Sequence, residues 1–224
     1  MMLDPTTIIR QISIALIPLI FAITLHEAAH GYVASKFGDT TALMLGRVSL
    51  NPTRHIDLFG TVILPIVMLI FGGFIFGWAK PVPVNWNNLR KPRRDMALVA
   101  IAGPAANLAM ALLWAIVAKL SLMSPASGAP GWAISTLSFL QLTSFFGIKI
   151  NIILMILNLL PIPPLDGSRI ISCILPPAAA IAYEKIEPFG IWILLGLIFI
   201  GALQRILGPL VLGAIQLIIQ LFNF

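Results

Sequence analysis

The chain has 224 residues, of which 59% are hydrophobic and only 10% are charged, whereas an average soluble domain carries about 25% charged residues. This composition excludes an ordinary soluble enzyme and indicates an integral membrane protein. The net charge of +6 does not indicate a nucleic-acid partner, because five of the 14 basic residues lie in one short loop, the usual positive-inside pattern beside membrane spans. This basic loop contains Lys80, Arg90, Lys91, Arg93 and Arg94.

The first part of the chain contains two apolar runs. Residues 8–37 are expected to form one helix, and residues 40–50, rich in Thr, Val and Leu, are predicted to form a strand at the membrane edge. The second apolar run, 58–78, is broken by paired glycines near its end. Residues 79–88 are predicted to be extended and rich in turns, because their two prolines disfavour a helix.

The second part of the chain begins with a clear spanning segment. Residues 96–122 are predicted to cross the membrane as a helix, since about 20 apolar residues suffice. A fourth run, 137–160, ends at a Pro-Ile-Pro-Pro sequence, and the apolar tail, 189–224, fits either one long tilted helix or two short ones. The predicted fold is therefore an all-α polytopic membrane protein with a membrane-edge hairpin or short strands and C-terminal helices.

The first apolar run carries the sequence His26-Glu27-Ala28-Ala29-His30. Helical positions i and i+4 lie on one face, so both imidazoles can reach a single Zn²⁺ ion, and Glu27 is placed to act on a metal-bound water. The alternative is a structural group of three polar side chains bonded to neighbouring helices. Burying such groups in a membrane without a chemical role is costly, which favours the metal site.

A catalytic zinc site uses three protein ligands and a water, so a third ligand is needed. The candidates are His55, Asp57 and Asp166. Asp166 follows a proline-rich break at the end of an apolar run and precedes a glycine, an arrangement that can direct a carboxylate at a metal. Asp166 can equally cap a helix that starts at Gly167, and the two roles are compatible. His55 and Asp57 fit either interfacial hydrogen bonding or the orientation of a ligand histidine.

Three separated motifs together resemble the site-2 protease family of intramembrane zinc metalloproteases. They are His26–His30, Gly103–Asn107 and the run from Asn158 to Gly167. The stretches Gly46–Asp57 and Gly77–Asn85 are similar to a compact bacterial branch that lacks a PDZ domain. The resemblance covers roughly residues 20–170, and the order of the motifs makes it specific.

This resemblance implies a role for each matching residue. His26, His30 and Asp166 are the implied ligands of one zinc ion, and Glu27 is the implied general base. The family fold implies a core of three membrane helices that carry the three motifs. We therefore expect a single integral membrane peptidase domain over residues 1–224, with the catalytic core at about 8–170 and membrane helices at about 189–224.

The order of the apolar runs provides a topological test of the ligand set. If the basic loop is cytoplasmic, the third run exits and the fourth returns, which places Asp166 on the cytoplasmic side. His30 reaches the same side only if residues 58–78 do not cross the membrane. We therefore predict a re-entrant segment there, a multi-pass protein of the cell membrane, and a zinc site toward the cytoplasm.

The predicted activity is cleavage of transmembrane segments of regulatory proteins by a zinc-activated water, so the partners are a transmembrane protein substrate and membrane lipid. Asn107 and Asn158 are candidates for binding the substrate or the oxyanion, and interhelical hydrogen bonding is an equal alternative for both. Two other functions fit part of the pattern: a membrane-bound zinc peptidase of quality control that cuts exposed loops, and a non-enzymatic metal transporter.

Overall fold

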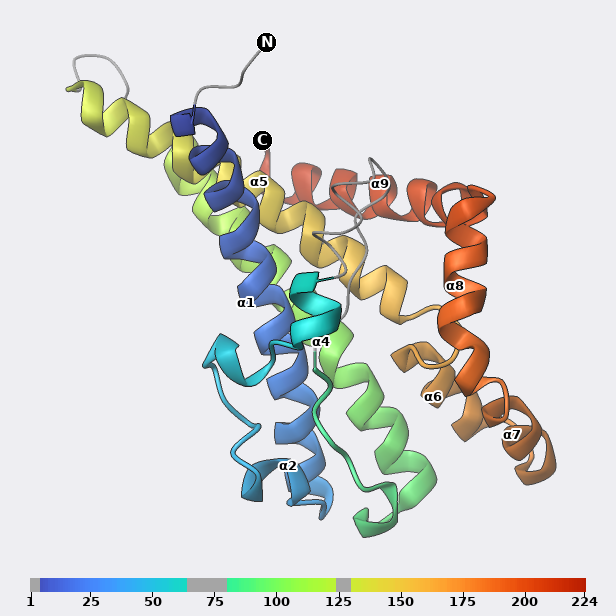
Figure 1. Cartoon of the computed structure of the whole chain (residues 1–224). Helices are drawn as coiled ribbons and strands as arrows, with labels where there is room; N and C mark the ends of the chain where they lie inside the picture. Colours follow the sequence, from blue (N-terminus) through green and yellow to red (C-terminus); the bar gives the residue numbers. More distant parts are fainter. Residues whose placement is uncertain (1–4, 64–79, 124–129) are drawn as a thin grey trace.

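The computed structural model describes residues 5–63, 80–123 and 130–224, and every regular element within them is helical (Figure 1). Four helices are long and apolar enough to cross a membrane by length and composition: α1 (Pro5–Phe37), α4 (Pro92–Met123), α5 (Gly131–Asn158) and α9 (Ala202–Phe222). The prediction of an all-helical polytopic membrane protein is confirmed.

The predicted membrane-edge strands are wrong within the described residues. Thr41–Met44 forms a short helix, α2, because the Asp39 carboxylate accepts the backbone N–H of Thr41 and starts a turn there. The stretch 80–85 has no regular secondary structure up to the 3-10 turn Trp86–Asn88. Its two prolines have no N–H to donate to a neighbouring strand, which disfavours a ladder.

Helices α1, α4 and α5 pack against one another and form the core of the bundle, as Figure 1 shows for the blue, green and yellow ribbons. Small residues allow α4 and α5 to approach closely. A Cβ added at Gly147 would lie 2.5 Å from Cγ of Trp114, so only glycine fits there. Three alanines of α4 are also fully buried in this packing, namely Ala111, Ala115 and Ala118.

The chain after α5 forms four more α-helices. They are α6 (Asp166–Ile174), α7 (Pro177–Glu184), α8 (Gly190–Phe199) and α9. The apolar tail therefore contains two helices rather than one, because Gly201 adopts a left-handed conformation with φ of 70° and breaks the helix between α8 and α9. Val211 and Ile218 of α9 pack against Ile148 and Ile152 of α5.

The end of α1 and the start of α4 lie side by side. The backbone N–H of Arg90 donates to the carbonyl of Phe37 over 3.0 Å, so the chain between these helices leaves and returns at the same end of the bundle. The predicted re-entrant segment at 58–78 requires the chain to return to the end of the bundle from which it left. Residues 58–63 form a π-helical turn, and the rest of that predicted segment lies outside the described residues.

Asp39 connects the end of α1 to the turn at 85–88. Its side chain is fully buried and accepts hydrogen bonds from the backbone N–H of Asn85 (2.7 Å) and from Nδ2 of Asn88 (3.0 Å), besides the two donors of Thr41. Burial alone raises the pKa of this carboxyl, but the hydrogen bonds outweigh burial and lower it. The ionised Asp39 therefore holds the turn at 85–88 against the end of α1.

We expect Asp39→Asn to destabilise the protein by about 1–3 kcal/mol, because one accepting oxygen becomes a donor that faces a buried N–H. Thermal unfolding in detergent at pH 7 measures this. Because the folded pKa is lowered, the stabilisation is present above about pH 4, the ordinary Asp pKa, and is lost as the pH falls through the folded value. Asn87→Ala, an exposed side chain in the same turn, is the control; equal melting of Asp39→Asn and the wild type would contradict the role.

Candidate metal centre

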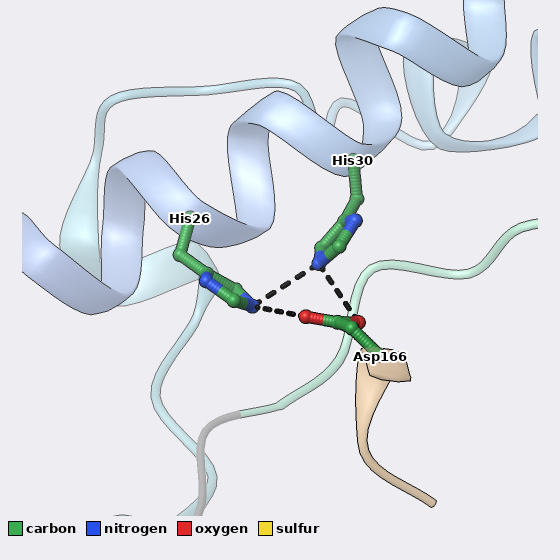
Figure 2. Close-up of side chains that lie close together, drawn as sticks. All are labelled: His26, His30 and Asp166. Atoms are coloured by element: carbon green, nitrogen blue, oxygen red, sulfur yellow. Dashed lines mark hydrogen bonds and ion pairs between the residues drawn. The ribbon is translucent and has the colours of Figure 1, made fainter. Parts of the chain in front are cut away.

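Helix α1 places His26 and His30 one turn apart on its buried face. Each residue is only 8% exposed, and the two rings meet edge to face with centroids 4.7 Å apart. Their Nε2 atoms lie 3.1 Å from each other and point to the same space (Figure 2). The helical spacing of the motif thus produces the converging pair that the sequence predicted.

Asp166 reaches the same space from the first residue of α6. Its Oδ2 lies 3.2 Å from Nε2 of His26, and its Oδ1 lies 3.3 Å from Nε2 of His30 (Figure 2). The break after α5 makes this possible, because α6 starts directly against the end of α5. A Cβ added at Gly167 would lie 2.3 Å from the carbonyl oxygen of Leu159, so the glycine after Asp166 is required for this approach.

The hydrogen bonds behind the two histidines fix their tautomers. Nδ1 of His30 donates to the carbonyl of Val99 over 2.8 Å. Nδ1 of His26 donates to Oδ1 of Asn107 over 2.6 Å, and that oxygen is an acceptor because the Asn107 amide nitrogen already donates to Ala22 and to Oδ1 of Asn151. Both Nε2 atoms therefore present lone pairs to the cluster.

The cluster fits a divalent cation on its own chemistry. Two imidazole lone pairs and two carboxylate oxygens face one another with no hydrogen between them, and Oδ2 of Asp166 is buried without a hydrogen-bond donor among the described residues. One potential ligand atom from each residue lies within 4.8 Å of the others, and two nitrogens with one carboxylate are a donor set that zinc accepts.

Helix α4 approaches this cluster through a glycine. A Cβ added at Gly103 would lie 2.3 Å from Nε2 of His30 and 2.6 Å from Nε2 of His26. Gly103 and Asn107 are four residues apart and so share one face of α4. The four-residue spacing of Gly103 and Asn107 is therefore a sequence signal for a helix face that packs against the two histidines. Gly103 had no predicted role of its own.

We expect Gly103→Ala to reduce zinc affinity by about 10- to 100-fold, because the added methyl group displaces both imidazoles. Zinc content of the purified protein after dialysis against a graded chelator measures this without reference to activity. Gly196→Ala in α8 is the matched control, since no atom lies within 4 Å of its added Cβ. Unchanged zinc retention in Gly103→Ala would contradict the proposed position of the metal.

Glu27 follows His26 in the sequence, and its side chain is half-buried. Its Oε2 accepts a hydrogen bond from the backbone N–H of Val82 over 2.7 Å. This donor leaves no signal in the sequence, because a main-chain N–H is common to almost every residue type. The Asn158 amide donates to the carbonyl of Leu154 within its own helix, over 3.0 Å. Asn107 contacts His26 directly, as described above.

The two other candidates for the third ligand lie apart from the cluster. His55 is buried, with Nε2 donating to the carbonyl of Ser49 over 2.9 Å. Asp57 accepts the backbone N–H of Gly60 over 2.7 Å. Within the described parts of the chain, the metal-type group formed around the two histidines contains Asp166 and neither of these residues.

Comparisons with known proteins show which family the chain is similar to. The family model described as "Peptidase family M50" matches residues 14–136 and 121–201. The protein named "Putative zinc metalloprotease YwhC" from Bacillus subtilis is 40% identical over 209 residues, which cover 92% of this chain and 90% of that protein.

Two relatives named Rip2, from Mycolicibacterium smegmatis and Mycobacterium tuberculosis, carry the same zinc metalloprotease description and are 31% and 33% identical. Their alignments cover 83% and 78% of this chain but only 66% and 62% of those proteins. No solved structure matches the chain.

Proposed function

Because this chain belongs to peptidase family M50, the site-2 protease family of membrane zinc metalloproteases, we propose that it is an intramembrane endopeptidase that cleaves transmembrane segments of regulatory proteins. The observation that carries this proposal is the cluster of His26, His30 and Asp166 beside Glu27. Polar groups of this kind, within and beside a spanning helix, mark a functional site.

His26, His30 and Asp166 are the proposed ligands of one zinc ion. Such an ion supplies a Lewis acid that polarises the scissile carbonyl and lowers the pKa of a water toward about 7. The chain supplies the rest of the chemistry. Asn107 and Val99 hold the two imidazoles in the tautomer that leaves Nε2 free, so no reorganisation of these ligands is needed when the substrate enters.

Glu27 is the proposed general base. Its Oε2 is held by the N–H of Val82, which leaves Oε1 to accept a proton from the attacking water. Glu27 then returns that proton to the nitrogen of the leaving peptide. Asn158 is proposed as a hydrogen-bond donor to the substrate or the oxyanion, which requires its amide to leave the Leu154 carbonyl. Asn107 reaches the reaction through His26.

We expect Glu27→Gln to lower the cleavage rate by about 100- to 10,000-fold while zinc remains bound, because the amide cannot take a proton. Two measurements check this: the initial rate on fluorescein-labelled β-casein in detergent, and membrane proteomics of a Glu27→Gln strain, where single-span stubs accumulate. Glu184→Gln, which removes a carboxylate from α7, is the control. A Glu27→Gln protein that cleaves at the normal rate would refute the assignment.

We further propose that the zinc site lies toward the cytoplasmic side of the cell membrane. The basic loop joins the chain to the start of α4, at the same end as Phe37 and its partner Arg90. Basic residues next to a span are retained in the cytoplasm. With α1, α4 and α5 each crossing once, the N-terminus then lies on the opposite side.

A labelling experiment tests this orientation. In a Cys173→Ser background, we expect Met2→Cys to react with an impermeant maleimide in intact cells, and Arg94→Cys to react only after permeabilisation. The background removes the single cysteine of the chain. Reaction of both positions from the same side would contradict the orientation.

A further inference from the structure

Two sequence motifs that supply no proposed metal ligand meet on the face of α1 that carries Glu27. Gly31 follows Glu27 by four residues and so shares this face. A Cβ added at Gly31 would lie 2.9 Å from Cγ2 of Val48 and 3.0 Å from Cγ1 of Val82. The segment Lys80–Val82, which we name the 80–82 segment, and the loop that precedes Asn51 are thus packed directly on α1 beside the general base.

The last residue of the 80–82 segment holds the proposed base. The backbone N–H of Val82 donates to Oε2 of Glu27 over 2.7 Å. Val82 lies between Pro81 and Pro83, which have no N–H, so it is the one main-chain donor available over three consecutive residues. The direction of this single donor decides where the Glu27 carboxylate is held.

Arg47 fixes the other end of the 80–82 segment. Its Nη2 donates to the carbonyl of Lys80 over 3.0 Å and to the carbonyl of Pro81 over 3.2 Å. The peptide unit whose N–H reaches Glu27 is the one that joins Pro81 to Val82. Arg47 therefore holds the oxygen of the same rigid, planar unit whose nitrogen holds the base.

Residues around His55 support the same segment. The backbone N–H of Lys80 donates to the carbonyl of His55 over 2.9 Å. The buried His55 ring in turn donates to the carbonyl of Ser49 over 2.9 Å. Meanwhile Nε of Arg47 is buried and has no hydrogen-bond partner among the described residues, so this half-buried side chain leaves part of its hydrogen-bonding capacity unused. Such a cost indicates a constraint other than stability alone.

We propose that Arg47 is a positioning residue for the general base: it clamps the Pro81–Val82 peptide so that the Val82 N–H fixes one oxygen of Glu27. This inference rests on the proposed role of Glu27. A carboxylate held at one oxygen has one orientation rather than several. Its other oxygen therefore already faces the attacking water before the reaction begins. Loss of the clamp leaves the zinc ligands intact and affects the catalytic step.

The test compares Arg47→Ala and Val82→Pro with the wild type, all full-length in detergent, with fluorescein-labelled β-casein as the probe. Val82→Pro deletes the N–H in a segment whose neighbours are already prolines. We expect both variants to lower kcat by about 10- to 100-fold, with KM, zinc content and melting temperature unchanged. Arg54→Ala, an exposed arginine of the same loop, is the matched control and keeps the wild-type kcat.

A double-mutant cycle separates positioning from a general structural effect. Glu27→Asp shortens the base by one methylene and moves it away from Val82. If Arg47 acts through Glu27, the double variant Arg47→Ala/Glu27→Asp is no slower than Glu27→Asp alone. Losses that multiply, a normal kcat in Arg47→Ala, or lost zinc or stability in both single variants would overturn the proposal. If Glu27→Gln retains full activity on casein, the proposed role of Glu27 as the base fails and this inference falls with it.

Discussion

The structure is organised around groups that repel one another unless a cation lies between them. Nε2 of His26 and His30 and both oxygens of Asp166 come within 3.3 Å or less of a neighbour in the cluster, and none carries a hydrogen toward the centre. In a low-dielectric environment such facing lone pairs are strongly unfavourable. They persist because the far side of each imidazole is bound to a fixed acceptor, Asn107 or Val99.

These acceptors tie helix packing to ligand geometry. The Asn107 side chain joins three helices, since it receives His26 of α1 and donates to Asn151 of α5, whose own amide bonds to Gly147. Each member of this chain has a partner inside the bundle, as polar groups in a membrane require. The small residues at Gly103 and Gly147 let the helices come close enough for these bonds. Interhelical packing and metal geometry are thus set by the same contacts.

Much of the site could be predicted from residue type and spacing. The pair His26 and His30 follows from helical periodicity, and Asp166 was among three candidates because a broken helix precedes it. The membrane-edge strands were wrong, because β-propensity at 40–50 was overridden by the turn that Asp39 starts at Thr41. The β-propensity of residues 40–50 takes no account of Asp39, whose ionised side chain determines the backbone conformation at Thr41.

The contacts that escaped sequence reasoning are those of the main chain. The Val82 N–H on Glu27, the Val99 carbonyl on His30 and the carbonyls under Arg47 involve atoms that every residue possesses. Their positions depend on how distant segments pack, which no local spacing encodes. The family-like stretches around Arg47 and Val82 were visible as motifs, but their purpose required three-dimensional contact with α1.

The hydrogen bond between Arg90 and Phe37 restricts how many times the chain between α1 and α4 can cross the membrane. Because the chain leaves α1 and rejoins α4 at one end of the bundle, any inserted stretch of chain there must cross the bilayer an even number of times, or not at all. A single added crossing would invert α4 and α5 and carry Asp166 to the face opposite His30. The requirement that His30 and Asp166 share one side thus constrains how the chain between these two helices can be built.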